Sequence, residues 1–252
     1  MTTSFTGTTR KALLLAGIAL STVISSASFA QEAAFSAAQK DEIKTVIKDY
    51  LMENPEIIAE AMNELQAKQQ REMEAQAAAK LVEYKDFFKT ADLPYAGNKD
   101  GDVTVIEFFD YNCGYCKKAF SDVQALLNTD DNVKVIFMEM PILSQQSMTA
   151  AKYALAAHKQ GKYFEFHKAL MEYQGSKDKA TLKRLATEVG LDADQLEKDA
   201  QDPALKDTIT ENVSIAQDIG IRGTPGFIVG DQLFRGYIGE EALIGSVKAQ
   251  RG

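Results

Sequence analysis

Two cysteines, Cys113 and Cys116, are the residues of this chain with the clearest capacity for chemistry. They are its whole cysteine content and stand in the sequence Cys-Gly-Tyr-Cys. A thiol at the start of a helix faces unsatisfied N–H groups and the positive end of the helix dipole, and both favour the thiolate. The thiolate is the nucleophile of thiol–disulfide exchange. The spacing therefore predicts a redox site in which Cys113 attacks and Cys116 resolves the mixed disulfide.

Three other uses of the pair are weighed. A structural disulfide across so short a loop would contribute little stability. A zinc site needs four ligands, and His158 and His167 lie nine residues apart, outside the usual spacing, so packing or surface roles are expected for them. Copper(I) binding by the two thiolates is chemically allowed and stays open as a secondary role. No metal site and no cofactor are predicted.

Two further groups are predicted to belong to the site. Glu107 stands six residues before Cys113 in an apolar run, where burial would raise its pKa and suit it to accept the proton of Cys116. Alternation along a strand could instead place Glu107 at a solvated edge. Thr224 and Pro225 precede a predicted hairpin, and a proline there carries no N–H to compete near a reactive sulfur.

Composition excludes several classes of protein. The chain has 252 residues, 45% of them hydrophobic, with 28 basic and 36 acidic side chains and a net charge of −8. This is ordinary globular composition, which argues against a disordered or collagen-like chain. Nucleic-acid binding is not expected, because it depends on neutralising phosphates with lysine and arginine. Two cysteines cannot build a disulfide-dense scaffold.

The first thirty residues are typical of a secretory signal peptide. Arg10 and Lys11 precede a mostly apolar run over 12–24, and Ser28 and Ala30 supply small residues before a cleavage site at Gln31. An uncleaved anchor remains an alternative. Cleavage would leave 222 residues with 26 basic and 36 acidic side chains, a net charge of −10. The protein is then expected in the periplasm, outside the reducing cytosol.

Residues 31–92 are predicted to form a helical stalk with an oligomerisation element. Ser36 and Gln39 match a capping box, and Asn54 followed by Pro55 is typical of a new helix start. Apolar residues at helical spacing are concentrated in 43–65, whereas 66–80 has almost none. A helix without such a stripe has no core to hold it. The alternative is a pair of helices folded back on their own domain.

Residues 93–252 are predicted to form an α/β catalytic domain. A buried strand over 103–109, a helix over 116–127 and a buried strand over 133–138 make a βαβ unit, preceded by a boundary loop over 92–102. A helical insertion follows over about 144–220. A hairpin over 226–236 and a helix over 240–248 end the chain.

The strand–CxxC–helix order, the acid six residues upstream, the helical insertion and Thr-Pro before a hairpin resemble the DsbA-type thioredoxin-fold disulfide oxidoreductases. The match covers about 93–252. Other segments resemble a narrower group, the suppressor-of-copper-sensitivity protein C-like and related bacterial DsbA-like proteins: Pro-Ile-Leu at 141–143, the alanine-rich 150–157, Gln-Gly-Lys-Tyr at 160–163 and 166–171. Residues 50–56 resemble their N-terminal region, which in some members builds a homotrimer.

The resemblance implies a thioredoxin fold with a helical insertion, preceded by the N-terminal helical stalk. It implies Cys113 as nucleophile, Cys116 as resolving thiol and Thr224–Pro225 as the cis-proline loop that shapes substrate docking beside Gly114 and Tyr115. It also implies protein thiol and disulfide substrates, a membrane redox partner that resets the active site, and a homo-oligomer, with the trimer favoured.

The dipeptide between the cysteines departs from the strongly oxidising prototype of the family. Gly114-Tyr115 replaces its Pro-His, and the prototype lacks the stalk. Gly-Tyr with threonine before the proline resembles the dimeric periplasmic isomerases. An oligomer would present several active sites to one misoxidised substrate. Together these features favour a disulfide isomerase or reductase, with a dedicated oxidase and a copper(I)-binding or chaperone-like protein as alternatives.

Overall fold

The computed structural model describes residues 35–252, and the predicted signal peptide lies outside them. The chain divides into two compact units, one extending to Glu60 and the other spanning Ala61–Gly252. A single helix, α2 (Glu56–Thr90), contributes residues to both.

The first unit contains helix α1 (Ala37–Glu53) and the start of α2. The predicted capping box is confirmed, because the Ser36 hydroxyl accepts from Gln39 N and the Gln39 side chain accepts from Ser36 N. Asn54 differs from the prediction. Its side-chain amide donates to the Tyr50 carbonyl at 2.8 Å, so it closes α1 instead of capping the next helix.

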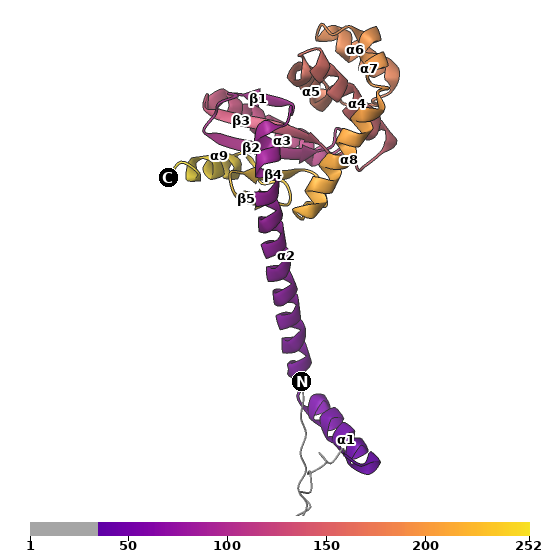
Figure 1. Ribbon diagram of the computed structural model, residues 1–252, viewed down its shortest axis with the longest axis vertical. Coiled ribbons are helices and arrows are strands. Elements are labelled where there is room, and N and C mark those ends of the chain that lie inside the picture. The colour runs from indigo at the N-terminus through magenta and orange to yellow at the C-terminus, as the bar shows by residue number, and fades with distance from the viewer. Residues whose placement is uncertain (1–34) are drawn as a thin grey trace, which may run out of the picture. The chain divides into compact units, whose positions relative to one another are not determined.

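A five-stranded mixed sheet in the order β1-β3-β2-β4-β5 forms the centre of the second unit (Figure 1). Strands β2 (Val103–Phe109) and β3 (Val133–Glu139) are parallel and joined by helix α3 (Gly114–Thr129), which confirms the predicted βαβ unit. The hairpin of β4 (Gly226–Val229) and β5 (Gln232–Phe234) is also confirmed and pairs antiparallel with β2.

The predicted boundary loop over 92–102 is wrong in part. Tyr95–Gly97 forms strand β1, which pairs antiparallel with β3 at the edge of the sheet. Pro94 and two glycines at 97 and 101 suggest a loop locally. The backbone hydrogen bonds of β1 go to β3, some forty residues later, so the pairing that makes this segment a strand has no local signal.

Side-chain alternation along β2 divides the core between the two faces of the sheet. Val105 and Phe109 lie in one apolar cluster with α3 and with helix α9 (Glu240–Ala249). Ile106 and Phe108 lie in the other, with Phe88 of α2 and the end of helix α8 (Pro203–Asp218). Glu107 shares the odd-numbered face of β2, the face that α3 covers.

The insertion between β3 and β4 is helical, as predicted. It consists of α4 (Gln145–Lys159), α5 (Tyr163–Glu172), α6 (Lys179–Glu188), α7 (Ala193–Asp199) and α8 (Pro203–Asp218). Figure 1 shows α4 to α7 grouped to one side of the sheet, with α8 returning toward it. Asp202 caps α8 and Pro203 is its first residue, positions at which aspartate and proline are common in helices.

Candidate active site

Cys113 is the N-cap residue of α3, directly after the turn that follows β2. Its sulfur lies 3.3 Å from the backbone N–H of Cys116, which donates to it. Helix α3 follows because its apolar residues recur every three or four positions and are buried against the sheet; they are Cys116, Ala119, Phe120, Val123 and Leu126. The local sequence thus places the thiol of Cys113 at the N-terminal end of α3 and the thiol of Cys116 one turn inside the helix.

The two thiols are free, and they differ in acidity. Hydrogen bonding from the Cys116 side chain is the largest cause that lowers the pKa of Cys113 from 9.0 to about 6, and the Thr224 contact and backbone N–H groups add to it against the effect of burial. Burial raises the pKa of Cys116 far above its ordinary value. Cys116 is fully buried, whereas Cys113 keeps 7% of its surface. Near pH 7, Cys113 is therefore the thiolate and Cys116 the thiol.

The predicted substrate-binding residues surround Cys113 on two sides. The Thr224–Pro225 peptide bond is cis, and the Cys113 thiol lies 3.3 Å from the Thr224 carbonyl oxygen, to which it can donate. Gly114 begins α3 with open space where a side chain would stand. Tyr115 is 64% exposed, and its ring centroid lies 5.9 Å from that of Tyr237. The structure brings Thr224 and Pro225, which are more than 100 residues from the nucleophile in sequence, to the same place as Cys113 and its neighbours Gly114 and Tyr115.

Glu107 is fully buried in β2, a central strand, so the alternative of a solvated edge is wrong. Burial is the largest cause that raises its pKa to about 8, and the nearby charges of Cys113 and Asp122 add to it. Neither carboxyl oxygen has a hydrogen-bond partner among the described residues. The charge of Glu107 in turn contributes to the raised pKa of Cys116. The carboxyl group is thus electrostatically coupled to both thiols.

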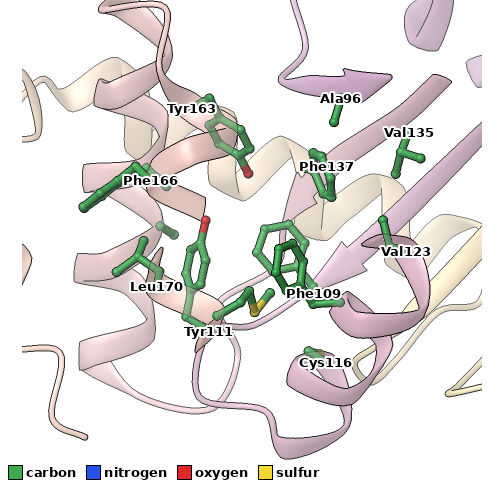
Figure 2. Packing of buried hydrophobic residues seen from close by; sticks show 14 of the residues in the cluster. Ala96, Phe109, Tyr111, Cys116, Val123, Val135, Phe137, Tyr163, Phe166 and Leu170 are labelled. Atoms are coloured by element: carbon green, nitrogen blue, oxygen red, sulfur yellow. The ribbon is translucent and has the colours of Figure 1, made fainter. Parts of the chain in front are cut away.

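A second buried acid, Glu139 at the end of β3, was missed by the sequence analysis. The hydroxyls of Tyr111 and Tyr163 donate to the same oxygen of Glu139, at 2.9 and 2.7 Å, and both rings lie in the cluster of Figure 2. Burial raises the pKa of Glu139 to about 8. Tyr111 also contacts Nδ1 of His167 at 3.0 Å, and burial lowers the pKa of that imidazole to about 3. His167 is therefore a neutral core residue, in line with the packing role expected for it.

Polar contacts between the insertion and the turn before Cys113 were also missed. Asp110, almost fully buried, accepts from the backbone N–H groups of Asn112 and Leu143 at 2.7 and 2.9 Å, and its carbonyl accepts from Cys113 N at 3.0 Å. The Asn112 amide donates to Ser144 and to Ser147 at 2.9 and 3.0 Å. A polar Asp-Tyr-Asn run after an apolar strand is the one sequence signal that could have indicated this turn.

Within residues 35–252, no group of three or more histidine, cysteine or acidic side chains is arranged to hold an ion. His158, the other histidine considered as a ligand, lies instead 3.3 Å from a carboxylate oxygen of Asp92. The part of the chain that the structure describes also has no helix with the length and apolarity to cross a membrane.

Comparison with known proteins gives two matching sequence families. The DSBA-like thioredoxin domain matches residues 104–247, which is more than half of the chain. The N-terminal domain of the copper resistance protein ScsC matches residues 39–72.

Several solved structures are similar. A thioredoxin-like oxidoreductase from Silicibacter pomeroyi has 44% identity and a TM-score of 0.62, over 65% of this chain and 95% of that one. The thiol-disulfide exchange protein alpha-DsbA2 from Wolbachia pipientis has 33% identity and a TM-score of 0.65, over 70% and 96%. Proteus mirabilis ScsC in a transitional conformation has 29% identity and a TM-score of 0.63, over 86% and 97%.

Among curated proteins the chain matches the Na(+)/H(+) antiporter NhaA 1 of Salinispora arenicola with 31% identity over 153 residues. This match covers 60% of the chain and spans 24% of the antiporter's length. The DSBA-like match contains both cysteines and all strands of the sheet except β1, and the similar solved structures include a thiol-disulfide exchange protein and a thioredoxin-like oxidoreductase. The chain belongs to the DSBA-like thioredoxin domain family of thiol–disulfide oxidoreductases.

Proposed function

We propose that the protein is a periplasmic thiol–disulfide oxidoreductase that acts on protein substrates, with isomerase or reductase activity favoured over dedicated oxidation. The unequal acidity of the two thiols carries this proposal. A thiol with a pKa of about 6 is mostly thiolate at pH 7, whereas its buried partner keeps its proton until it is needed. Such a pair can attack a substrate disulfide through Cys113 and then resolve the mixed disulfide through Cys116.

In the proposed reaction, the Cys113 thiolate attacks a substrate disulfide, forms a mixed disulfide and expels the other substrate sulfur as a thiolate. In isomerisation, a substrate thiolate then attacks the mixed disulfide, which restores Cys113 with no net change of oxidation state. In reduction, Cys116 loses its proton to Glu107 and attacks the Cys113 sulfur, which breaks the mixed disulfide and releases the second substrate sulfur as a thiolate. Two electrons then pass to the substrate, and the enzyme is left as a disulfide that a membrane redox partner would reduce.

The proton acceptor role of Glu107 is supported by its position and acidity. A carboxyl with a pKa of about 8 holds and releases a proton close to neutral pH, as general base catalysis requires. A charge on Glu107 also raises the pKa of Cys116, so each group makes it harder for the other to lose its proton. Glu107 therefore has the protonation behaviour that the resolving step needs.

We further propose that residues 31–92 form an oligomerisation segment and 93–252 the catalytic domain. The first unit exposes a set of large apolar side chains, which are Phe35, Ile43, Val46, Ile47, Tyr50, Met52 and Ile58. Exposed apolar surface of this density is typical of interaction sites. The ScsC N-terminal match over 39–72 covers most of these residues. A trimer is favoured on the family resemblance.

Refolding of a scrambled multi-disulfide enzyme tests the proposed function. The wild-type protein should restore activity to the scrambled substrate in a glutathione buffer, and Cys113→Ser should not. Rapid oxidation of a reduced peptide without reactivation would indicate the dedicated oxidase. Stoichiometric binding of copper(I) by the reduced protein, without any disulfide exchange, would indicate the metal-binding alternative. Activity retained in Cys113→Ser would contradict the mechanism itself.

A further inference from the structure

We propose that Lys177 is a positioning residue of the redox site, which holds Asn112 in place and directs a buried positive charge at the Cys113 turn, so that the thiolate of Cys113 is favoured. The inference uses the proposed function in one respect, the assignment of Cys113 as the nucleophile. Lys177 comes from the segment between α5 and α6, far from the cysteines in sequence, and no pattern in the sequence pointed to it.

Hydrogen bonds connect Lys177 to the residue that precedes the nucleophile. The Lys177 Nζ donates to Oδ1 of Asn112 at 3.4 Å, and the backbone N–H of Lys177 donates to Gln146 of α4 at 3.2 Å. The amide nitrogen of Asn112 is occupied by Ser144 and Ser147. Both ends of the Asn112 side chain are therefore held by the helical insertion, and the next residue is Cys113.

The burial of Lys177 is costly and calls for a reason. Its side chain is only 1% exposed, whereas lysine is almost never fully buried unless it is paired. None of the lysine ion pairs found among residues 35–252 includes Lys177. The hydrogen-bond partner of its Nζ, Asn112, is neutral. An apolar side chain of similar length would fill the same space without the cost of burying a charge. A group that opposes stability at a reactive site is a candidate for function.

Charged side chains near the turn before Cys113 act on Lys177 in opposite directions. Lys117, in the first turn of α3, donates from Nζ to the Tyr173 carbonyl at 2.7 Å and repels Lys177. Asp110 is the carboxylate that attracts Lys177, and its oxygens are already engaged by backbone N–H groups. Lys177 is thus subject to one repelling cation and one attracting carboxylate. Ionisation of Cys113, the residue after Asn112, adds a negative charge to this turn.

Other ionisable groups near the turn also affect the ionisation of Cys113 and of Lys177. Glu107 and Cys116 lie on the sheet and helix side, and a charge on Glu107 opposes ionisation of the thiols. Burial and the repulsion by Lys117 lower the pKa of Lys177 to about 8. The lysine is therefore mostly charged below pH 8, including the range over which Cys113 titrates. Its effect should be present at pH 6 to 7 and should fade as the pH rises past 8.

The experiment titrates Cys113 alone, in a Cys116→Ser background that leaves it as the single thiol of the chain. Thiolate absorbance is followed against pH with Lys177, with Lys177→Met, which keeps the apolar stem, and with Lys177→Gln, which keeps a donor without charge. The matched control is Lys179→Met, two residues further on and exposed in an ion pair with Glu197. Alkylation rate at pH 6 and equilibrium with glutathione are measured on the same panel, the latter with Cys116 present.

Loss of the charge should raise the pKa of Cys113 by about half a unit to one unit, which is about a two- to fivefold loss of thiolate and of alkylation rate at pH 6, where the wild-type thiol is about half ionised. The glutathione equilibrium should move toward the disulfide form by a similar factor, because the reduced form loses stabilisation. Lys177→Met should also melt no lower than the wild type, since it removes a buried charge. Lys179→Met should change none of these quantities.

A purely structural lysine gives the opposite pattern. If Lys177→Met lowers the melting temperature and leaves the Cys113 titration unchanged, or if Lys177→Gln keeps the wild-type titration, the inference is wrong. Its failure is separable from failure of the proposed function. A wild-type protein that exchanges no disulfides but still shows the shift in Lys177→Met would contradict the function alone, and active variants with identical titrations would contradict this inference alone.

Discussion

The two thiols of the pair lie three residues apart, yet they hold their protons with very different strength. Cys113 receives hydrogen bonds at the helix start, whereas Cys116 lies in the apolar core beside a buried carboxyl. The difference comes from the surroundings of each sulfur, since both are ordinary thiols. Predictions about acidity therefore belong to single residues.

Alkylation of the reduced protein should follow the ionisation of Cys113. We expect the rate to be half-maximal near pH 6, because the thiolate is the reacting species and the pKa is about 6. Modification should stop at one thiol per chain at neutral pH, since Cys116 is buried and protonated. Mass spectrometry after a pH series checks both points. A midpoint near the ordinary value, about pH 8.5, would contradict the geometry.

Glu107→Gln should slow the resolving step and leave the first attack unchanged. The mixed disulfide between Cys113 and a peptide should persist longer, because Cys116 has lost its proton acceptor. Quenched-flow trapping of the mixed disulfide measures this. The conservative control is Glu107→Asp, which keeps a carboxyl and should retain part of the rate. Equal lifetimes in wild type and Glu107→Gln would remove Glu107 from the mechanism.

The same substitution should stabilise the fold in a pH-dependent way. The folded pKa of Glu107 is raised from 4.5 to about 8, so the wild type loses stability as the pH rises through this range, while glutamine does not. The gain in unfolding free energy should be near zero at pH 4 and on the order of 3–5 kcal/mol at pH 9. Denaturant melts of the reduced protein at the two pH values test the sign. A gain confined to low pH would contradict the burial argument.

At the scale of elements, strand β1 depends on contacts that its own sequence does not reveal. Gly97, the last residue of β1, has φ of +81°, and an added Cβ would overlap the Val133 carbonyl and lie 2.8 Å from Cδ2 of Leu127. The strand therefore lies against the end of α3 and the start of β3 at a distance that permits no side chain.

Gly97→Ala should destabilise the catalytic domain by about 2–4 kcal/mol, the sum of left-handed backbone strain and overpacking. Gly161→Ala is the matched control, because its φ is +70° but no atom lies within 4 Å of an added Cβ. It should cost only about 1 kcal/mol. Thermal melts compare the two. Equal losses would mean that the close approach of β1 contributes nothing.

The segment after β3 holds exposed apolar side chains beside the nucleophile. Ile142 and Leu143 are 42% and 54% exposed, and the N–H of Leu143 donates to Asp110, whose carbonyl accepts from Cys113 N. We expect a substrate chain that reaches Cys113 to pass close to these residues and to gain apolar contact from them.

Leu143→Ser should weaken binding of substrate peptides that carry an apolar residue next to their cysteine. We expect about a three- to fivefold higher KM for a leucine-flanked peptide and little change for a serine-flanked one, since about 1 kcal/mol of apolar contact is lost. Steady-state kinetics on the two peptides measures the difference. Val82→Ser, exposed on α2, is the control. An equal change with both peptides would contradict apolar recognition.

At the scale of the whole molecule, the first unit lacks a core of its own among its described residues. No residue of α1 is buried, and Ile47, Leu51, Met52, Pro55 and Ile58 line an open apolar hollow. A pair of helices with this much exposed apolar surface gains stability when a second copy covers it. Association through this unit is what we expect.

Ile47→Glu should dissociate the oligomer, because each copy would bury a charge in the interface. Light scattering should report the monomer mass for this variant and a multiple of it for the wild type. Thr45→Glu on the same helix adds the same charge at an exposed polar position and should leave the mass unchanged. The dissociated variant should keep alkylation of Cys113 and lose scrambled-substrate refolding. A monomeric wild type would refute the oligomer.

Sequence alone determined several of the helix starts, the βαβ unit, the hairpin and the position of the cysteine pair at the start of a helix. These follow from local rules: apolar periodicity, capping residues such as Ser36 and Asp202, and the CxxC spacing at the start of a helix. Glu107 was predicted as a buried acid for the same reason, because an acidic residue within an apolar run can be recognised from the sequence of that one strand.

Tertiary structure decided what depends on residues distant in the chain. Strand β1 exists because β3 supplies its hydrogen bonds, and the Glu139 cluster and Lys177 are identified as buried only when the insertion packs against the sheet. The acidity of Cys113 likewise depends on a hydrogen bond from the side chain of Thr224, which is 111 residues away. Burial and electrostatic coupling are properties of neighbours in space, so a pattern along the chain does not contain them.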